Sequence, residues 1–590
     1  MKIIINRKIE NRCIVETVSD WKGIIEQIKN RVVLFIDANI KRLYGLPTIN
    51  GIVFEVEAKD EFKNVSYYSK FVDEMGKHKM DTQTVIVSVG GGSVSNLAGF
   101  IAATYKRGIE FVSFPTTVLA MADACISYKQ ALNTECGKNQ IGCYKVPSNI
   151  YVYYDFLKTL DDRFIWDGYA EIIKHAVCEN FTLSDDMFSN VMKTIQAKIE
   201  HIRNDPWELH PILMYGHQYG HALEYVSKDK YYHGEAVNVG MIGTSHVGYV
   251  LGIHDDTLID IHKRYSDTFH LPKMFRCGEI FNMNEMFNFM CNDKSVKNGQ
   301  IHFSFGENLV NDTISVDTDT LCYGLNKVCI DRMIFPNKSE MHKIAYGTCG
   351  AKEGDVYEAI KCGYRTIDCA HFYGNEIMIG KEIKKCIDEG VCTREDLFII
   401  GKLWNDQHGD VRNACQNSID ALQVKYLDMY LVHWPVIYKD GERFDADVVE
   451  VFTEMKKLEG TLCKNVGVSN FKIEHLEKIK HMKPALNQIE LHPYFQQKEL
   501  CDYCDKNMIN IMAYSPMSKD ALIDEQICTI ANDRGCAPSV VVMSWILNTG
   551  AALAVKSVNH MTENLNLNFT LTEREFGSIK DKNIRIIQER

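Results

Sequence analysis

The chain lacks long hydrophobic runs, a basic excess and much proline. Among 590 residues there are 12 prolines, and 78 acidic residues outnumber 66 basic ones. No apolar stretch approaches the roughly 18 residues of a membrane helix, so we expect no membrane partner. A net charge of −12 is opposite to that of a nucleic-acid-binding face, so we expect no nucleic-acid partner. Low proline with only 38 glycines excludes a collagen-like or disordered chain.

The N-terminus also lacks the apolar core of a secretory signal. In MKIIINRKIENR, three isoleucines are followed at once by charged residues, which predicts an edge strand and a cytoplasmic location. The 20 cysteines are then expected to be reduced thiols. The only CxxC, Cys501–Cys504, has no partner pair, which argues against a zinc site there.

Two patterns divide the chain, whose length exceeds the roughly 250–300 residues of one domain. Residues 1–160 contain the short strands VVLFIDA, GIVFEVE, TVIVSVGGG and IEFVSFPTT, the alternation of an α/β nucleotide-binding domain. Residues 161–330 are mainly helical by pattern. We therefore predict an α/β domain followed by a mainly α domain.

Residues 331–590 alternate strands and helices in eight units. The strands are HKIAYGT, YRTIDCA, LFIIGKLW, DMYLVHWP, KNVGVSN, ALNQIEL, INIMAYSP and ALAVKSV. Eight units in about 250 residues predict a (β/α)8 TIM barrel. The preceding segment NKVCIDRMIFPNKSEM carries apolar residues and a turn, which predicts a short hairpin that closes the barrel bottom.

Glycines and one acid indicate a nucleotide site in the first domain. Gly90, Gly91 and Gly92 follow an apolar strand and precede a helix, so backbone N–H groups there can approach a pyrophosphate. A plain tight turn is the alternative. Asp37 ends VVLFIDA, where it could bind a ribose hydroxyl or cap a helix.

Histidines and a carboxylate indicate a metal site in the second domain. His217 and His221 are four residues apart in GHQYGHALE, and His233 heads HGEAV. Glu171 and Lys174 share AEIIKHA. Each histidine alone is more often structural, but two neutral imidazoles with a carboxylate can hold a divalent cation and leave positions open for substrate.

Residues 1–325 resemble the sugar phosphate cyclases, the dehydroquinate synthase superfamily. The motifs GGGSVSNLAGF, PTT, KQALN, GKNQIG, GYAEIIKHA, GHQYGHALE and HGEAVNVGM occur in order over nearly the whole half. The resemblance implies that NAD⁺ oxidises a ring hydroxyl, a metal holds the substrate hydroxyls, phosphate is eliminated, the hydride returns, and the opened enol aldehyde closes as a carbocycle. It also implies a homodimer through this half.

The same resemblance implies roles for single residues. Glu171, His217 and His233 would bind zinc or cobalt. Arg107 is a candidate phosphate contact. Substrate binding and proton transfer would fall to Lys129, Asn133, Lys138, Asn139, Lys174 and His221. With Asp37 and the three glycines, the NAD set would comprise Asp60 or Glu61 with Lys63, Asn96, Thr116, Thr117 and Asp123.

Three departures bear on the substrate. The arginine that holds the substrate carboxylate in dehydroquinate synthases is His210 here, GGKTAIN is SYKQALN, and the aspartate of GDLAG is Asn96. All three resemble the 2-deoxy-scyllo-inosose synthases, which cyclise glucose 6-phosphate, a substrate without a carboxylate. A 3-dehydroquinate synthase or a 2-epi-5-epi-valiolone synthase type of cyclase is the alternative.

Chemistry in a barrel lies at the C-terminal ends of its strands. Asp368, Lys402 and His433 stand at such ends, and Tyr373 follows on a loop. A tyrosine hydroxyl beside lysine and aspartate can donate a proton to a carbonyl as a hydride arrives, and we expect the lysine to lower the pKa of the phenol. A structural ion pair is the alternative.

Residues 333–590 resemble the aldo-keto reductases, through YRTIDCAHFYGNE, REDLFIIGKLW, LDMYLVHWP, NVGVSNF, LNQIELHP, MAYSP and VKSV. The resemblance implies a catalytic tetrad of Asp368, Tyr373, Lys402 and His433. The nicotinamide cofactor would be bound by Ser469, Asn470, Gln488, Tyr514, Ser515, Lys556 and Ser557. Thr562 replaces the arginine usual after that lysine, so NADPH and NADH both stay open.

Together, the predictions for the two halves indicate a bifunctional enzyme. Its first half would make a cyclic ketone from a hexose phosphate, and its second half would reduce that ketone, or a related one, to a deoxy-cyclitol. Two alternatives stay open. The halves could act on unlinked substrates, or one half could be a degenerate scaffold without activity.

Overall fold

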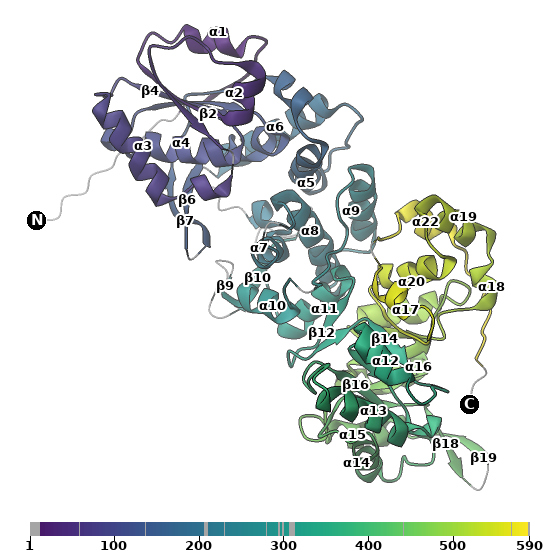
Figure 1. Ribbon diagram of the computed structural model, residues 1–590. Coiled ribbons are helices and arrows are strands. Elements are labelled where there is room, and N and C mark those ends of the chain that lie inside the picture. The colour runs from purple at the N-terminus through teal and green to yellow at the C-terminus, as the bar shows by residue number, and fades with distance from the viewer. Residues whose placement is uncertain are drawn as a thin grey trace, which may run out of the picture.

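The computed structural model describes residues 12–57, 59–135, 137–205, 211–228, 230–278, 280–292, 296–297, 300–305, 313–439, 442–567 and 569–587. Figure 1 shows three parts in a row: an α/β part in purple, a helical part in teal, and a barrel in green and yellow. The edge strand expected at residues 1–12 falls almost wholly outside the described residues.

A parallel sheet forms the core of the first part. Within the described residues its strand order is β1-β8-β5-β4-β2-β3. β2 and β4 are buried at every residue, as expected for continuous apolar runs between two layers of helices. The strands are β1 (Ile14–Thr17), β2 (Val32–Asp37), β3 (Gly51–Val56), β4 (Val85–Gly90), β5 (Glu110–Pro115) and β8 (Asn149–Val152). The four predicted strands are confirmed as β2 to β5.

An antiparallel hairpin of β6 (Lys129–Thr134) and β7 (Gly137–Tyr144) projects from this part. It carries the KQALN and GKN motifs, for which the sequence had predicted no strands. The helical segments around the sheet are α1 (Trp21–Glu26), α2 (Ala38–Tyr44), η1 (Asp60–Phe62), α3 (Val65–Lys77), α4 (Gly92–Thr104), η2 (Tyr105–Arg107), η3 (Ala120–Ala124) and η4 (Tyr154–Thr159).

The second part is mainly helical, as predicted, and includes one small sheet. Its helices are α5 (Asp162–Cys178), α6 (Met187–Asn204), η5 (Pro211–Met214), α7 (His217–Val226), α8 (His233–Val250), α9 (Thr257–Thr268), α10 (Met283–Asn292) and α11 (Thr318–Val328). The sheet comprises β9 (Val296–Lys297), β10 (Gln300–Phe303) and β11 (Ile314–Val316).

The third part is a closed parallel barrel, as predicted. Its strands, in order around the described barrel, are β14 (Ile344–Gly347), β15 (Thr366–Asp368), β16 (Phe398–Leu403), β17 (Leu427–Val432), β20 (Cys463–Ser469), β21 (Leu486–Glu490), β22 (Asn510–Tyr514) and β23 (Ala552–Val555). Each falls within one predicted strand or differs from it by one residue. A hairpin of β18 (Val436–Lys439) and β19 (Glu442–Asp445) follows β17.

Helices surround this barrel. They are α12 (Asp355–Cys362), η6 (His371–Tyr373), α13 (Glu376–Asp388), α14 (Val411–Ala421), α15 (Val448–Lys456), α16 (Ile473–Ile479), η7 (Lys480–Met482), α17 (Lys498–Lys506), α18 (Lys519–Leu522), α19 (Glu525–Arg534), α20 (Pro538–Asn548), α21 (Met561–Leu565) and α22 (Glu573–Ser578).

The predicted hairpin before the barrel is present as β12 (Arg332–Ile334) and β13 (Glu340–His342). Met333, Phe335 and Met341 pack in one cluster with residues of the barrel interior. These apolar side chains fill the bottom of the barrel. The domain boundaries expected at 160/161 and 330/331 stay predictions.

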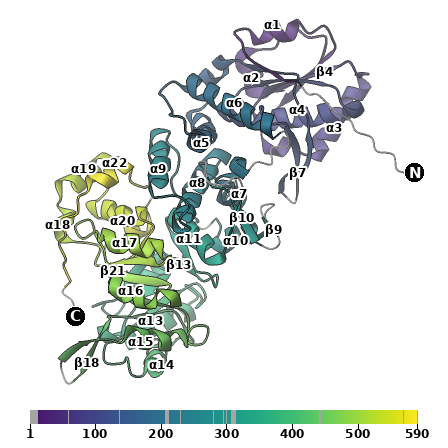
Figure 2. The ribbon, with the colours of Figure 1, turned by 180° about the vertical axis from the view of Figure 1, so that it is seen from behind.

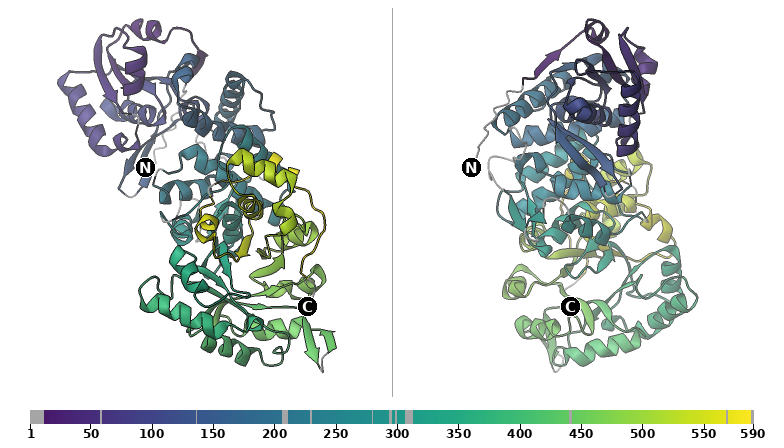
Figure 3. Two further views of the ribbon diagram at one scale, coloured as in Figure 1. Left: turned by 45° about the vertical axis from the view of Figure 1, so that its right-hand side comes forward. Right: turned by 90° about the vertical axis from the view of Figure 1, so that its left-hand side faces the viewer.

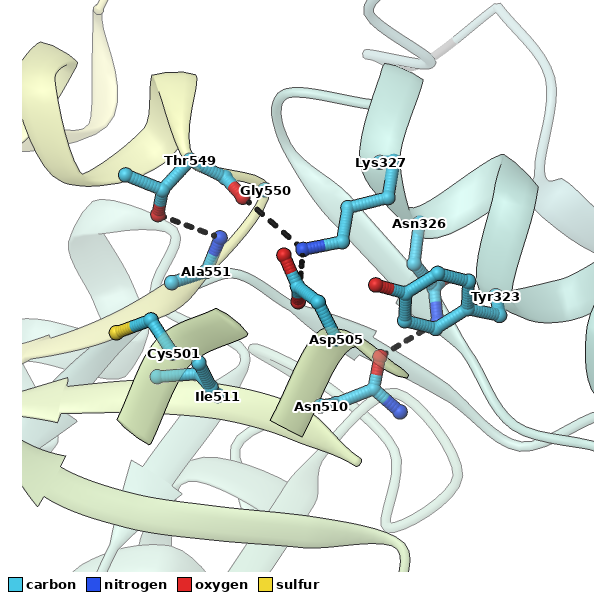
Figure 4. A pocket seen from close by; sticks show the side chains of 10 residues that line it. All are labelled: Tyr323, Asn326, Lys327, Cys501, Asp505, Asn510, Ile511, Thr549, Gly550 and Ala551. Carbon is cyan, nitrogen blue, oxygen red and sulfur yellow. Dashed lines mark hydrogen bonds and ion pairs between the residues drawn. The ribbon is translucent and has the colours of Figure 1, made fainter. Parts of the chain in front are cut away.

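The helical part contacts the bottom of the barrel, where its strands begin (Figures 1, 2 and 3). Figure 4 shows one such contact, in which Lys327 of α11 pairs with Asp505 at 2.6 Å and donates to the Thr549 carbonyl at 3.2 Å. Beside it, Asn326 donates to Asn510 at 3.1 Å. The cavity between them is only about 30 Å³, room for about two water molecules, so this joint is tightly packed.

A buried lysine crosses the same joint. Lys343 has no solvent exposure, and its Nζ donates to the carbonyls of Asn326, Cys329 and Gly550 at 2.7, 2.8 and 2.7 Å. Since the joint occupies the barrel bottom, the C-terminal mouth opens away from the helical part. Hairpin β18–β19, beyond the end of β17, lies on that far side in Figure 1.

Among the described residues, no helix is both long enough and apolar enough to cross a lipid bilayer.

Candidate active sites

Three helices bring a carboxylate and two imidazoles together in the helical part. Glu171 lies within α5, while His217 and His233 are the first residues of α7 and α8. The Nε2 atoms of His217 and His233 are 3.5 and 3.7 Å from Glu171 Oε1. This carboxylate is fully buried, and its other oxygen, Oε2, is paired with the Lys174 ammonium. Ligands of a tetrahedral ion lie about 3.3 Å apart, so this cluster fits a divalent cation.

The charges in this cluster favour metal ligation. Burial alone would raise the pKa of Glu171, but the adjacent Lys174 ammonium and the two histidines lower that pKa well below its usual value. Burial and Lys174 lower the pKa of His217 to about 3, which keeps its imidazole neutral. For His233, burial is outweighed by Glu171 and Glu224, which raise its pKa well above normal. A divalent cation that replaced the proton on His233 would balance the negative charges of Glu171 and Glu224 in its place.

Hairpin β6–β7 places further predicted residues close to the cluster. Lys138 Nζ reaches Glu224 of α7 at 2.7 Å. The backbone N–H of Asn139 donates to the Asn133 side chain at 2.9 Å. Lys129 begins the hairpin at β6. Since Glu224 also contacts His233, Lys138 links the hairpin to the metal cluster.

The structure moves Lys63 toward this substrate side. Its ammonium donates to the Asn139 side chain, and its carbonyl accepts from the Asn133 N–H at 2.7 Å. The sequence had grouped Lys63 with the NAD residues Asp60 and Glu61. Asp60 begins η1, but its side chain lies outside what is described. His210 also lies outside the described residues.

One further histidine and one lysine lie beside the cluster. The ring of His221 lies 5.1 Å from that of His217 and 6.2 Å from that of His233. Lys174 is buried, and its Nζ also donates to the Leu213 carbonyl at 3.3 Å. The structure therefore brings His221 beside the two candidate histidine ligands and Lys174 against the candidate carboxylate ligand.

The glycine turn has the geometry of an anion site. β4 ends at Gly90, and α4 begins at Gly92 without a side-chain cap. A Cβ added to Gly90 would lie 2.6 Å from the side chain of Val94, and one on Gly91 would lie 3.3 Å from Thr117. Uncapped N–H groups at a helix start can hold a phosphate of NAD. Asn96 stands in the second turn of the same helix.

Two carboxylates of the predicted NAD set have protein partners. Asp37 caps α2, accepting from the N–H groups of Asn39 and Ile40 at 2.7 and 3.3 Å, which was its alternative interpretation. Asp123 pairs with Lys198 of α6 at 2.9 Å. Burial would raise the pKa of Asp123, but Lys198 lowers it to about 2. Thr116 donates its N–H to the Gly90 carbonyl at 3.1 Å, so it adjoins the glycine turn.

The second site lies at the mouth of the barrel. Lys402 is fully buried on β16, and its Nζ pairs with Asp368 at 2.7 Å and donates to the hydroxyl of Tyr373 at 3.3 Å. The ring of His433 stands edge-on to Tyr373 at 5.9 Å between centroids. Gln488 donates to the same Asp368 oxygen at 3.0 Å. All four residues of the predicted tetrad are therefore adjacent.

One expectation about this site is corrected. The charge of Lys402 does lower the pKa of Tyr373, but burial outweighs it and raises that pKa to about 12. Asp368 and Tyr373 together raise the pKa of Lys402 despite its burial. Tyr373 therefore keeps its proton across the neutral range, which suits a proton donor.

Polar side chains from the next strands adjoin the tetrad. Asn470 donates to the His433 carbonyl at 2.9 Å and accepts from the Tyr514 hydroxyl at 2.7 Å. Ser469 donates to the Gln488 carbonyl at 2.9 Å. Farther round the mouth, Ser515 follows β22, and Lys556 and Ser557 follow β23. Lys556 donates to the Cys349 and Gly350 carbonyls at 2.9 and 3.1 Å. This row of donors and acceptors fits a nicotinamide nucleotide laid across the mouth.

Sequence reasoning missed four residues at these sites. Phe372 stacks on Trp404 at 3.9 Å beside His433 and forms an aromatic wall. Glu224 shares a helix face with His217 and His221, a spacing that could have indicated it. No local signal could have indicated Lys198, because α6 meets Asp123 only in the folded chain.

The barrel and its mouth place the second half among the barrel oxidoreductases. A family model described as aldo/keto reductase family matches residues 351–584. Models described as 3-dehydroquinate synthase N-terminal and C-terminal match residues 53–167 and 168–296. The chain belongs to the aldo/keto reductase family through its second half, and its first half carries both 3-dehydroquinate synthase domains.

Curated relatives support the barrel assignment. Aldose reductase of Encephalitozoon cuniculi is 37% identical over 260 residues, covering 39% of this chain and 86% of that protein. Aldose reductase C of Dictyostelium discoideum is 35% identical over 260 residues, covering 39% and 81%. NAD(P)H-dependent D-xylose reductase of Scheffersomyces stipitis is 32% identical over 286 residues, covering 41% and 89%.

Proposed function

We propose that the chain is a bifunctional enzyme of carbocyclic sugar synthesis. Its first half converts glucose 6-phosphate to 2-deoxy-scyllo-inosose with elimination of phosphate. Its second half reduces that ketone, or a related carbonyl, to a deoxy-cyclitol. The observation that carries the proposal is the pairing of an intact Glu171–His217–His233 cluster with an intact Asp368–Tyr373–Lys402–His433 mouth in one chain.

In the first half, Glu171, His217 and His233 would hold a zinc or cobalt ion, and the glycine turn would hold NAD⁺. The bound groups supply a Lewis acid for the sugar hydroxyls and a reversible hydride acceptor. Lys129, Lys138 and Asn139 would bind the sugar phosphate from the hairpin. His221 would move a proton at the leaving phosphate oxygen. The substrate loses only the elements of phosphoric acid, so the net reaction is redox-neutral.

In the second half, the Tyr373 hydroxyl would donate its proton to the carbonyl oxygen of the substrate. The Lys402 ammonium, held in place by Asp368, stabilises the tyrosinate that forms. His433 would orient the carbonyl, and Trp404 with Phe372 would pack on the carbon face of the ring. Bound NADPH or NADH supplies the hydride, so the product gains two hydrogens.

A different sugar phosphate is the rival substrate for the first half. A 3-dehydroquinate synthase or 2-epi-5-epi-valiolone synthase type of cyclase, fused to a reductase with an unlinked substrate, is that alternative. The departures at His210 and Asn96 favour glucose 6-phosphate. We also propose a homodimer through the first half, which sedimentation of the full chain would test.

Product analysis tests the proposal. The full chain would be given glucose 6-phosphate, NAD⁺ and zinc or cobalt, with and without NADPH or NADH. We expect phosphate release and a carbocyclic ketone, which becomes two mass units heavier only with reduced cofactor. If phosphate were released but the ketone persisted in the presence of reduced cofactor, the reductase would act on another substrate. If no phosphate were released, glucose 6-phosphate would be excluded as the substrate. Sedoheptulose 7-phosphate and the dehydroquinate precursor would then be tested in its place.

A further inference from the structure

Glu224, in the last turn of α7, touches both the metal cluster and the hairpin. Its Oε2 lies 3.2 Å from His233 Nδ1, and its Oε1 lies 2.7 Å from Lys138 Nζ. Its side chain is only 13% exposed. One carboxylate therefore joins a candidate ligand on α8 to hairpin β6–β7.

The contact decides which nitrogen of His233 can bind a cation. His233 Nε2 lies 3.7 Å from Glu171 Oε1, so Nε2 is the nitrogen that faces the candidate cation site. To bind a cation, this nitrogen must be unprotonated. Glu224 can only accept a hydrogen bond from Nδ1, which places the remaining ring proton there. His217 is held in the same way, because its Nδ1 lies 3.1 Å from the Tyr215 carbonyl. Both imidazoles are thus oriented by an acceptor behind the ring.

The neighbouring backbone is fixed as well. Asp167 accepts from the N–H groups of Gly234 and Glu235 at 2.6 and 3.2 Å and so holds the first turn of α8. The backbone position of His233 is therefore set without Glu224. What Glu224 adds is the rotation and tautomer of the ring, together with the position of Lys138.

We propose that Glu224 is the positioning residue that presents His233 to the cation and anchors hairpin β6–β7 at the same site. The proposal rests on the metal site of the proposed function. Glu224 contacts neither the cation nor the reacting atoms, so its effect is expected first in metal affinity. Loss of such a carboxylate behind a histidine ligand typically weakens metal binding by about 10- to 100-fold.

Chelator competition measures this directly. The full chain and the variants Glu224→Gln, Glu224→Asp and Lys138→Met would be titrated with zinc and with cobalt against a chromogenic chelator. We expect about 10- to 100-fold weaker binding for Glu224→Gln, an intermediate loss for Glu224→Asp, and a change below about threefold for Lys138→Met. Circular dichroism and thermal unfolding of the same chains report that each variant is folded.

A second readout addresses the hairpin. Hydrogen exchange in residues 129–144 should accelerate in both Glu224→Gln and Lys138→Met, although only the former loses metal affinity. Wild-type affinity in Glu224→Gln would overturn the proposal, as would equal loss in Lys138→Met. If the wild-type chain itself bound no cation, the metal site of the proposed function would fail instead, so the two failures are distinguishable.

Discussion

Both candidate sites contain a buried lysine paired with a carboxylate, but the carboxylates differ in what else they face. Glu171 Oε2 is paired with Lys174, and two imidazoles face Oε1. Asp368 Oδ1 instead accepts from both Lys402 and Gln488. The carboxylate that faces two imidazoles is suited to bind a cation. Asp368 holds Lys402 beside a proton donor.

The sites also differ in placement. The cluster lies in the helical part, and the barrel attaches to that part by its bottom, with Lys343 and Lys327 inside the joint. The reductase mouth opens at the opposite end of the barrel. If the first site supplies the second, as we propose, its product would reach the second site of its own chain through solvent, and the fusion would supply proximity only.

The largest expected effect is the loss of phosphate release on removal of a candidate metal ligand, because only the first site is proposed to need a cation. Glu171→Gln removes a charged candidate ligand, so the rate of phosphate release should fall by about 10³-fold or more. Reduction of an added carbonyl should change by less than about twofold. Stripping the chain with a chelator should give the same pattern. Equal loss of both activities would contradict the separation.

The converse variant addresses the barrel. Tyr373→Phe removes the proton donor, so carbonyl reduction should slow by about 10²- to 10⁴-fold while phosphate release is unchanged. Tyr357→Phe, on the outer surface of the barrel, is the matched control. Steady-state kinetics with both substrates would check this. A Tyr373→Phe chain that still reduces the carbonyl at the wild-type rate would show that Tyr373 takes no part in the chemistry.

The joint should matter to stability and not to chemistry. Lys343→Met leaves three buried carbonyls without their donor, so the free energy of unfolding should fall by about 3 kcal/mol. Both activities should persist at 25 °C. Lys519→Met on the surface is the control, and denaturant titration is the measurement. An unchanged midpoint would show that the joint does not depend on this lysine.

The smallest effect concerns pH. The pKa of Asp123 in the folded chain is about 2, below its ordinary value of 3.8. Its ionised form therefore stabilises the fold above about pH 4, and this contribution is lost as the pH falls toward 2. The stability difference between wild type and Asp123→Asn should shrink over that window. A difference that is constant with pH would mean that the Lys198 pair contributes nothing.

The sequence predicted the barrel better than the first half. In a barrel the chemistry lies at strand ends, so Asp368, Lys402 and His433 could be found in order from eight periodic strands. For the first half, periodicity indicated β2 to β5, but the hairpin of KQALN and GKN escaped it. Those segments mix polar residues, glycine and single apolar residues, so they lack the continuous apolar run that indicated the strands of the sheet.

Partners distant in sequence explain what else was missed. Lys138 and Glu224 are 86 residues apart, and Asp123 and Lys198 are 75 apart. No local pattern encodes such pairs. The pKa of Tyr373 was wrongly expected to fall, because a neighbouring charge can be inferred from sequence whereas the depth of burial cannot.

A mixing experiment tests the central claim, that two complete sites work in turn through solvent. Glu171→Gln and Tyr373→Phe chains would be combined with glucose 6-phosphate, NAD⁺, the metal and reduced cofactor. We predict that neither chain alone makes the deoxy-cyclitol. The mixture should make it at a rate near that of a wild-type sample that contains the same number of intact sites. A mixture that accumulates only the ketone, while wild type makes the deoxy-cyclitol, would contradict the claim.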